Sequence, residues 1–113
     1  MSDLVVYKLV TVGEYEELRR MGEFRGSPAD IKAGFIHMSS RTQLAVTVEK
    51  HFRDRADIVV AAIDLGKLGN VVRWEPSRNG ELFPHLYGAL PINAVMAVAV
   101  LERLPDGSVR LPV

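Results

Sequence analysis

The segment at residues 58–65, Ile-Val-Val-Ala-Ala-Ile-Asp-Leu, limits the fold most strongly because it is apolar at every position except Asp64. A half-buried strand alternates apolar and polar side chains, whereas an almost continuous apolar run is typical of a strand covered on both faces. The fold must therefore place apolar material on each side of this strand. The chain has 113 residues, which is enough for one domain over residues 1–113 that buries about two thirds of its unfolded surface.

Local patterns predict a strand and a helix before this segment. Residues 4–10 are rich in β-branched and apolar side chains and favour a strand. Thr11 and Glu14 then form a capping-box pattern, which predicts the start of a helix. The apolar residues spaced three and four apart on the expected inner face of this helix are Tyr15, Leu18 and Met21.

A second capping-box pattern, from Ser40 to Gln43, predicts a helix that runs to about Arg53. The other predicted elements are a loop at 24–28, a helical turn at 29–32, short strands at 34–38 and 70–74, an irregular segment at 75–91, a long strand at 94–104, and a turn at 105–107 leading to a strand at 109–113. The predicted class is therefore α+β, with a mostly antiparallel sheet and two main helices in the N-terminal half.

Charge and composition exclude several classes of function. The 14 basic side chains are balanced by 14 acidic ones, and general nucleic-acid binding depends on an excess of Lys and Arg. The sequence contains no cysteine, which excludes disulfides, thiolate metal sites and thiol catalysis. Residues 1–4 lack the features of a secretory signal, and Pro84, Gly88 and Pro91 interrupt the one long uncharged stretch. We therefore expect no membrane association and a cytoplasmic location.

The first candidate site lies at residues 34–40. His37 is placed where a short strand ends, and Ser39 and Ser40 precede the second predicted helix. The free N–H groups at a helix start bind phosphate or carboxylate, and the two hydroxyls would assist there. A purely structural role is the alternative, in which Ser40 caps the helix and His37 bonds a buried carbonyl.

The second candidate site lies at residues 73–88. Trp74 or Phe83 could stack on a planar ring, Glu75 could act as a general base or bind a ribose hydroxyl, and His85 could face His37 across a cleft. Alternatively, this segment is an apolar cluster that anchors a loop, with Glu75 paired to a nearby arginine. His37, His85 and Glu75 have no recognised metal-ligand spacing, so we predict no metal site.

Several strings together resemble the small bacterial family called domain of unknown function 952. They are Val6-Tyr7-Lys8-Leu9, Gly34-Phe35-Ile36-His37-Met38-Ser39, Gln43, Trp74-Glu75 and Phe83-Pro84-His85-Leu86-Tyr87-Gly88. The resemblance implies an ADP-ribosyltransferase-like fold, near the NAD-dependent RNA 2′-phosphotransferases. In the pattern that those enzymes resemble, one strand ends in Tyr-His-Gly-Thr and a later strand ends in Val-His-Leu-Ser. Tyr7-Lys8 and Ile36-His37-Met38-Ser39 fall at these two places, so Lys8 replaces the histidine that would hold the nicotinamide ribose.

Together, the residues and the resemblance favour a small transferase-like enzyme that binds a nucleotide or NAD-like ligand. His37, His85 and Glu75 are the predicted catalytic residues. The predicted ligand-binding residues are Tyr7, Lys8, Ser39, Ser40, Gln43, Trp74, Phe83 and Tyr87. NAD is the cofactor that the resemblance implies, and Lys8 leaves its use open. The alternatives are a binding module without turnover and an interaction domain that docks residues 83–87 on a partner, with the protein a monomer or weak homodimer.

Overall fold

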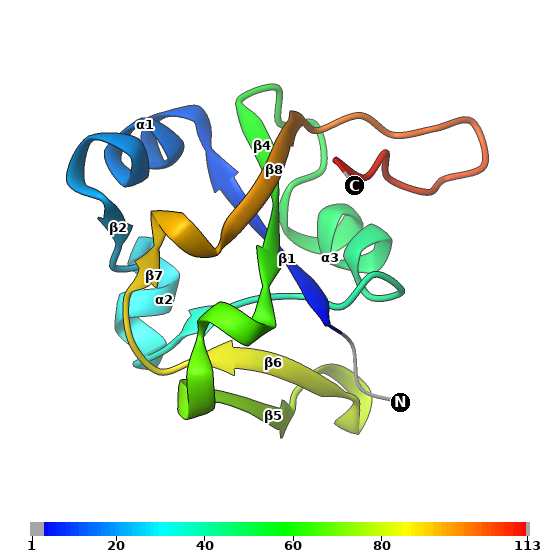
Figure 1. The fold of residues 1–113 in the computed structure, drawn as a ribbon. Helices are drawn as coiled ribbons and strands as arrows, with labels where there is room; N and C mark the ends of the chain where they lie inside the picture. The colour runs from blue at the N-terminus through cyan, green and yellow to red at the C-terminus, as the bar shows by residue number, and fades with distance from the viewer. Residues whose placement is uncertain (1–3, 113) are drawn as a thin grey trace.

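A three-stranded antiparallel sheet built around the apolar segment forms the centre of the molecule (Figure 1). The computed structural model describes residues 4–112. Strand β4 (Ile58–Asp64) lies between β1 (Val5–Thr11) and β8 (Val95–Val100). Alternate β4 side chains enter two separate core clusters, one containing Val59 and the other Val60. The expected strand covered on both faces is therefore confirmed.

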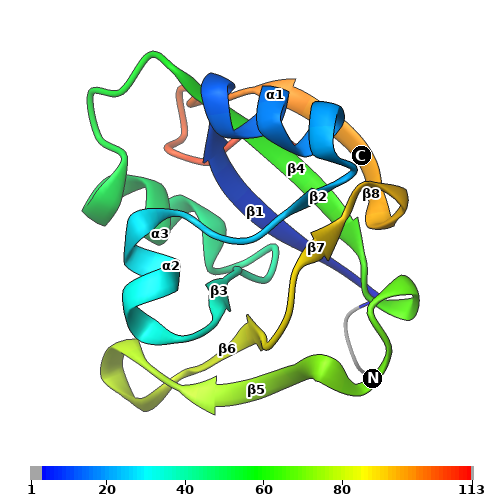
Figure 2. The same cartoon turned by 90° about the vertical axis from the view of Figure 1, so that its left-hand side faces the viewer.

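One face of this sheet is covered by α1 (Val12–Met21) and by two smaller antiparallel sheets (Figure 2). The first pairs β2 (Glu23–Phe24) with β7 (Leu90–Pro91). The second has the order β3-β6-β5, with strands Ile36–His37, Leu82–Leu86 and Val72–Pro76. The buried side chains that these elements contribute are Leu18, Phe24, Ile36, Leu86 and Leu90.

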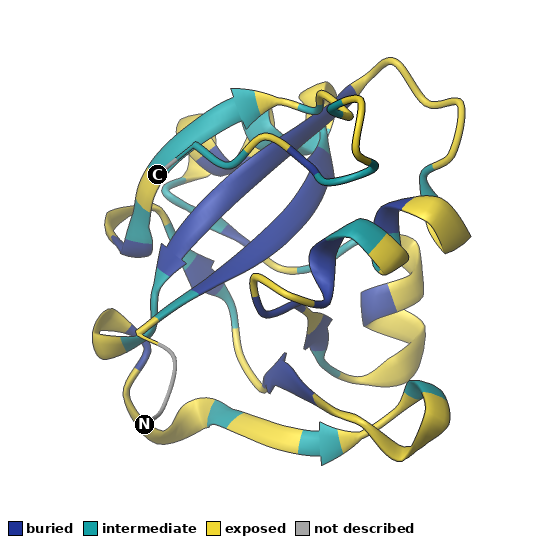
Figure 3. Ribbon diagram, turned by 90° about the vertical axis from the view of Figure 1, so that its right-hand side faces the viewer, coloured by how far each residue is buried: buried dark blue, intermediate teal, exposed yellow. Residues whose placement is uncertain are grey.

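The other face is covered by α3 (Leu44–His51) and by the C-terminal segment. Leu44 and Val48 of the helix and Val109 of that segment pack on Tyr7 and Leu9 of β1. Figure 3 shows β1 and β4 buried along most of their length between these layers. The remaining helices are α2 (Pro28–Ala33) and the short 3-10 segments Leu65–Lys67, Gly69–Val71, Arg78–Gly80 and Ile92–Ala94.

The α+β class and the antiparallel pairing agree with the sequence analysis, and α2 adds a third α-helix within residues 4–112. The predicted helix after Thr11 is confirmed, and its capping box is complete, with Thr11 Oγ1 accepting from the Glu14 N–H at 3.0 Å. The inner-face prediction is wrong for Met21, which is 65% exposed, because Leu18 and Tyr15 alone carry the contact of this face with the core.

The second capping box is not formed, and α3 begins at Leu44 and ends at His51, short of Arg53. Ser40 donates its backbone N–H to Gln43 Oε1 at 2.9 Å, but its hydroxyl bonds Thr42 and does not cap the helix. The Gln43 amide instead donates to the Leu82 carbonyl at 2.7 Å, which fastens this turn to β6. A tertiary contact has replaced the local cap.

The segment predicted to be irregular, residues 75–91, contains β6 and β7, so that prediction is wrong. Pro84 lies within β6, the middle strand of its sheet, where a proline is normally excluded because it donates no hydrogen bond. Its carbonyl accepts from the Met38 N–H at 3.1 Å, so its nitrogen faces the side on which β3 has already ended at His37. The missing donor therefore leaves the pairing of β6 with β5 intact and falls where the pairing of β6 with β3 ends.

The C-terminal part differs from the prediction as well. β8 ends at Val100, and the predicted hairpin is reduced to a single bridge between Arg103 and Val109. The last residue of the strand predicted at 109–113, and residues 1–3 of the segment compared with a secretory signal, lie outside the described residues. Within residues 4–112, no helix is long and apolar enough to cross a membrane.

We expect Thr11→Ala to lower the free energy of unfolding by about 1 kcal/mol, because the N-cap acceptor of α1 is lost. Urea unfolding followed by circular dichroism measures this change. Thr11→Ser keeps the hydroxyl and should stay close to the wild type. Equal losses for the two variants would show that the methyl group of Thr11, and not its hydroxyl, stabilises this corner.

Candidate functional site

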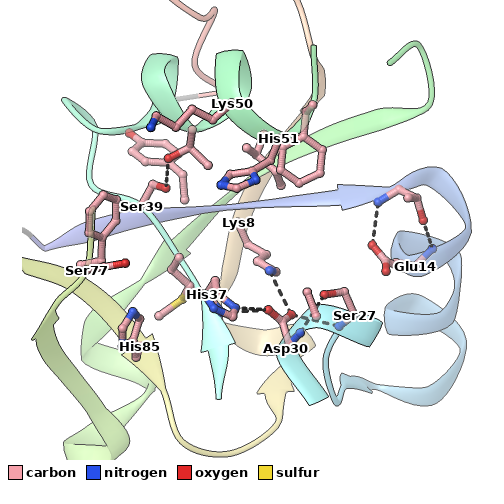
Figure 4. Close-up of a pocket in the computed structure, with 18 of the residues that line it drawn as sticks. Lys8, Glu14, Ser27, Asp30, His37, Ser39, Lys50, His51, Ser77 and His85 are labelled. Carbon is pink, nitrogen blue, oxygen red and sulfur yellow. Dashed lines mark hydrogen bonds and ion pairs between the residues drawn. The ribbon is translucent and has the colours of Figure 1, made fainter. Parts of the chain in front are cut away.

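A cleft of about 840 Å³ opens along β1 at the edge opposite to β4. Figure 4 shows β1 crossing it, with α3 on one side and α2 and β3 on the other. Four basic side chains and two carboxylates line it, namely Lys8, Lys50, Arg55 and Arg78 against Glu14 and Asp30. Three histidines also line it. Because Lys and Arg side chains outnumber carboxylates in the lining, the cleft has a positive character that suits an anionic ligand.

Asp30 is buried at the base of this cleft and accepts four hydrogen bonds. The local sequence Gly26-Ser27-Pro28 places it there: Pro28 starts α2, and Ser27 and Asp30 form a reciprocal capping box. Gly26 has a φ of 125°, and a Cβ on it would lie 2.9 Å from Asp30 Cβ, so only glycine allows the turn to pass so close.

The four donors to Asp30 come from three different elements. Oδ2 accepts from the Ser27 N–H at 2.9 Å and from Lys8 Nζ at 3.0 Å. Oδ1 accepts from the His37 N–H at 3.1 Å and from His37 Nδ1 at 2.6 Å. Figure 4 shows Lys8 and His37 both directed at Asp30. This carboxylate therefore joins β1, α2 and β3.

The environment of Asp30 keeps it ionised. Burial alone would raise its pKa, but the hydrogen bond from His37, the charge of Lys8 and the two backbone N–H donors together hold the pKa well below its ordinary value. Since the carboxylate stays charged near neutral pH, Lys8 and His37 keep an anionic partner throughout that range.

His37 combines a fixed ring with an accessible edge. Nδ1 donates to Asp30, the ring of Phe35 lies 4.7 Å away, and the side chain is still 45% exposed. The hydrogen bond at Nδ1 sets the tautomer, which leaves Nε2 with a lone pair when the ring is neutral. The structural bond of this ring therefore goes to the Asp30 carboxylate and not to the buried carbonyl expected from the sequence, and it leaves Nε2 unused.

His85 is held in the same way by a second carboxylate. Its Nδ1 lies 2.7 Å from Glu75 Oε1, across the register of β5 and β6, and the same oxygen accepts from the Tyr87 hydroxyl at 2.7 Å. These bonds, with the His85 bond the stronger cause, lower the pKa of Glu75, and the bond to Glu75 raises the pKa of Tyr87. Glu75 therefore orients His85 as an ionised acceptor.

The two histidines lie side by side because β3 and β6 pair them directly, His37 with His85, so they do not face each other across the cleft as predicted. Their ring centroids are 5.7 Å apart and the rings meet edge to face at 68°. Phe35 stacks on His85 at 4.0 Å as well as contacting His37, so a single aromatic ring supports both imidazoles. The arrangement gives two oriented imidazoles on one wall of the cleft, suited to proton transfer.

The structure brings together six of the eleven predicted catalytic and ligand-binding residues. They line the cleft and are Tyr7, Lys8, His37, Ser39, Phe83 and His85. The link between the two motifs is a backbone bridge: the Tyr7 N–H donates to the Ser39 carbonyl at 2.8 Å and the Ser39 N–H donates to the Tyr7 carbonyl at 2.9 Å.

The other five predicted catalytic and ligand-binding residues lie outside the lining of the cleft. Glu75 and Tyr87 are behind His85, as described above. Ser40 and Gln43 are buried, with their side chains used in hydrogen bonds to the chain itself. Trp74 alternates with Glu75 along β5, so it points to the opposite face of that strand and does not stack in the cleft.

The sequence analysis missed Asp30, Phe35, Lys50 and Arg78. The signal for Asp30 was present: Ser27-Pro28-Ala29-Asp30 has a capping acceptor, a proline at the first helical position and an acidic residue three positions on. Arg78 lies over the Phe83 ring at 4.8 Å and reaches Thr47, contacts that depend on tertiary folding and leave no local signal.

Among residues 4–112, no group of three or more His, Asp or Glu side chains has an arrangement that could hold a metal ion. Within the same range, Lys50 and Arg78 line the cleft and form no ion pair with a carboxylate. Their charges are therefore not neutralised by a carboxylate of the described chain.

Comparison with known proteins agrees with the resemblance. A family model described as protein of unknown function, DUF952, matches residues 9–98. This chain belongs to the DUF952 family. The matched range includes Asp30, His37, Glu75 and His85, and the family description gives no activity. No curated protein matches the chain.

Two solved structures are similar to this chain. The X-ray structure of protein CC0527 from Caulobacter crescentus is 37% identical over 95% of this chain and 94% of that chain, with a TM-score of 0.86. The solution NMR structure of CC0527 is also 37% identical, covers 95% and 91% of the two chains, and has a TM-score of 0.80. The chain therefore shares the fold of CC0527 along nearly its whole length.

We expect Asp30→Asn to lower the free energy of unfolding at neutral pH by about 3–5 kcal/mol, because it leaves the buried Lys8 ammonium without its anion. The difference from the wild type should shrink with acidity. Folding lowers the Asp30 pKa, so this carboxylate contributes stability above the unfolded carboxyl range and loses it as pH falls below about 4.

Chemical denaturation of both proteins between neutral and acidic pH measures this difference. Glu17→Gln, an exposed carboxylate change on α1, is the matched control and should leave the curve close to the wild type. A gap between Asp30→Asn and wild type that stays constant with pH would contradict the electrostatic explanation.

Proposed function

We propose that the cleft binds a phosphate-bearing ligand of the nucleotide class, NAD-like molecules included, and supports a transfer reaction on it. The observation that carries the proposal is the pair of carboxylate-oriented histidines, His37 and His85, on one wall of a cleft with an excess of basic side chains. Acid–base catalysis needs imidazoles whose tautomer is fixed and whose second nitrogen is accessible.

The size and lining of the cleft agree with such a ligand. A volume of about 840 Å³ lies in the range of small-molecule sites, which are mostly apolar with a few placed polar groups. Tyr7, Leu9, Met38 and Phe83 supply apolar and aromatic surface for a base, while Lys50 and Arg78 supply charge for phosphates.

The relative placement of two motifs supports an ADP-ribosyltransferase-like origin for the fold, which we include in the proposal. In that resemblance, the ends of two strands hold one nucleotide, and here Tyr7 of β1 and Ser39 after β3 are joined by two backbone hydrogen bonds. Lys8 has the position of the ribose-binding histidine, but its ammonium is engaged by Asp30. His37 is therefore the side chain that we assign to the ribose side of the cleft.

An enzyme is favoured over a binding module because both histidines are oriented by carboxylates. Recognition of an anion alone would be served by lysine or arginine and would not require fixed imidazole tautomers. An interaction site at residues 83–87 is less well supported, since residues 83–86 are buried in β6 and Tyr87, which is 36% exposed, bonds Glu75 through its hydroxyl.

A thermal-shift experiment with ADP-ribose, NAD and adenosine nucleotides tests the proposal. A ligand present at about 100 times its Kd should raise the unfolding free energy by about 2.7 kcal/mol. We expect Lys50→Ala and Arg78→Ala each to weaken binding about tenfold or more, because a hydrogen bond to a charged group contributes about 1.5–3 kcal/mol.

Arg20→Ala is the matched control, since Arg20 is exposed on α1 and its loss changes the net charge by the same amount. It should leave the shift unchanged. If no nucleotide stabilises the wild type, or if Arg20→Ala weakens binding as much as the cleft variants, the assignment of this cleft is wrong.

A further inference from the structure

We propose that His37 and His85 act together as a general acid and a general base that break a P–O bond in a ribonucleotide phosphodiester. The inference rests on the proposed nucleotide cleft and adds the bond that is cleaved. It depends on the juxtaposition of two carboxylate–histidine pairs, Asp30 with His37 and Glu75 with His85, through neighbouring strands.

Both imidazoles are fixed by the same means and from two sides. Each Nδ1 donates to a carboxylate, at 2.6 Å for His37 and 2.7 Å for His85, and Phe35 packs against both rings. The carboxylates are themselves held, Asp30 by Lys8 and Glu75 by the Tyr87 hydroxyl. Such support keeps a reacting group in one orientation, which catalysis requires.

The second nitrogen of each ring remains available to a substrate. Within residues 4–112, the side-chain hydrogen bonds of these two rings involve Nδ1, and no buried side-chain nitrogen lacks a partner. The Nε2 of His85 therefore keeps some accessible surface although the residue is only 5% exposed, and His85 lines the cleft with His37. With ring centroids 5.7 Å apart on one wall of the cleft, the two rings can both reach atoms of one bound phosphodiester.

The presence of two proton-transfer groups favours P–O cleavage over cleavage of a glycosidic bond to nicotinamide. Nicotinamide leaves through its ring nitrogen as a neutral pyridine and needs no proton. In a phosphodiester, the attacking hydroxyl must lose a proton and the departing alkoxide must gain one, which occupies one base and one acid.

The step is balanced without an oxidant or a further reactant. The ribose 2′-hydroxyl attacks phosphorus and gives its proton to the neutral Nε2 of one histidine. The other, protonated histidine gives its Nε2 proton to the leaving 5′-oxygen. One P–O bond forms and one breaks, which yields a 2′,3′-cyclic phosphate and a free 5′-hydroxyl, and the two histidines exchange protonation states. Lys50 and Arg78 line the cleft and can stabilise negative charge on the phosphoryl oxygens.

Two uridine 3′-phosphodiester probes distinguish the histidine that acts as the acid from the one that acts as the base. The first is uridylyl-(3′→5′)-adenosine, whose leaving alkoxide needs a proton; the second is uridine 3′-(p-nitrophenyl phosphate), whose leaving phenolate does not. We expect His37→Gln and His85→Gln each to lower kcat on the first probe by about 100-fold or more, because removal of a general acid or base has that effect. On the second probe, one variant should recover to within about tenfold of the wild type, and that residue is the acid.

Arg20→Gln is the control, because Arg20 is exposed on α1 and does not line the cleft. It should retain the wild-type kcat within about twofold, because a side chain outside the cleft takes no part in binding or proton transfer. Purification of all variants in parallel, with the His37→Gln/His85→Gln double variant as a blank, removes any contribution from contaminating nucleases.

The outcomes separate this inference from the proposed function. Binding of 3′-UMP in a thermal-shift experiment, with cleavage that the double variant lacks, supports both. Binding without cleavage, cleavage that the double variant retains, or nicotinamide release from NAD in place of phosphodiester cleavage overturns the P–O assignment and leaves the nucleotide cleft standing. Absence of any 3′-UMP or other nucleotide binding overturns the proposed function together with this inference.

Discussion

The Asp30 carboxylate is the interaction on which the cleft depends. It accepts four hydrogen bonds and thereby joins Lys8 of β1, the start of α2 and both the backbone and the ring of His37. A buried ion pair adds little stability by itself, since desolvation offsets most of the attraction, but removal of one partner is costly. The arrangement therefore acts mainly as a device for orientation: once Asp30 is buried and ionised, Lys8 and His37 have one favourable position each.

The second histidine is positioned by sheet register. A shift of one residue between β3 and β6 would turn either His37 or His85 to the opposite face, because side chains alternate along a strand. β3 has only two residues, so it relies on the Met38–Pro84 bond and on the Tyr7–Ser39 bridge to hold that register. The hydrogen bond from the Gln43 side-chain amide to the Leu82 carbonyl fixes the start of β6. Residues predicted to bind ligand thus hold the strands that carry the histidines.

The sequence predicts those parts of this fold that depend on local or periodic signals. The buried strand at Ile58–Asp64 and the capping box at Thr11 belong to this group, because side-chain pattern and a three-residue hydrogen bond decide them. β6 was missed because Pro84 forbids a middle strand unless the neighbouring strand has ended, which is a tertiary fact. The pattern from Ser40 to Gln43 wrongly predicted a capping box for the same reason, since the carbonyl that the Gln43 side chain bonds lies 39 residues away. The candidate site was half predictable: the histidines stand out by type, whereas Asp30 and Arg78 gain their roles only through the fold.

The structural and the functional interpretation of the histidines are compatible. A histidine that donates Nδ1 to a carboxylate contributes to folding, and in our proposal the same bond prepares Nε2 for proton transfer. Loss of stability on substitution of His37 is therefore no argument against a catalytic role, nor is loss of activity an argument for one. Leaving-group dependence distinguishes the two, because a change in folding alters the rate on every substrate alike, whereas loss of a general acid is felt only where the leaving oxygen needs a proton.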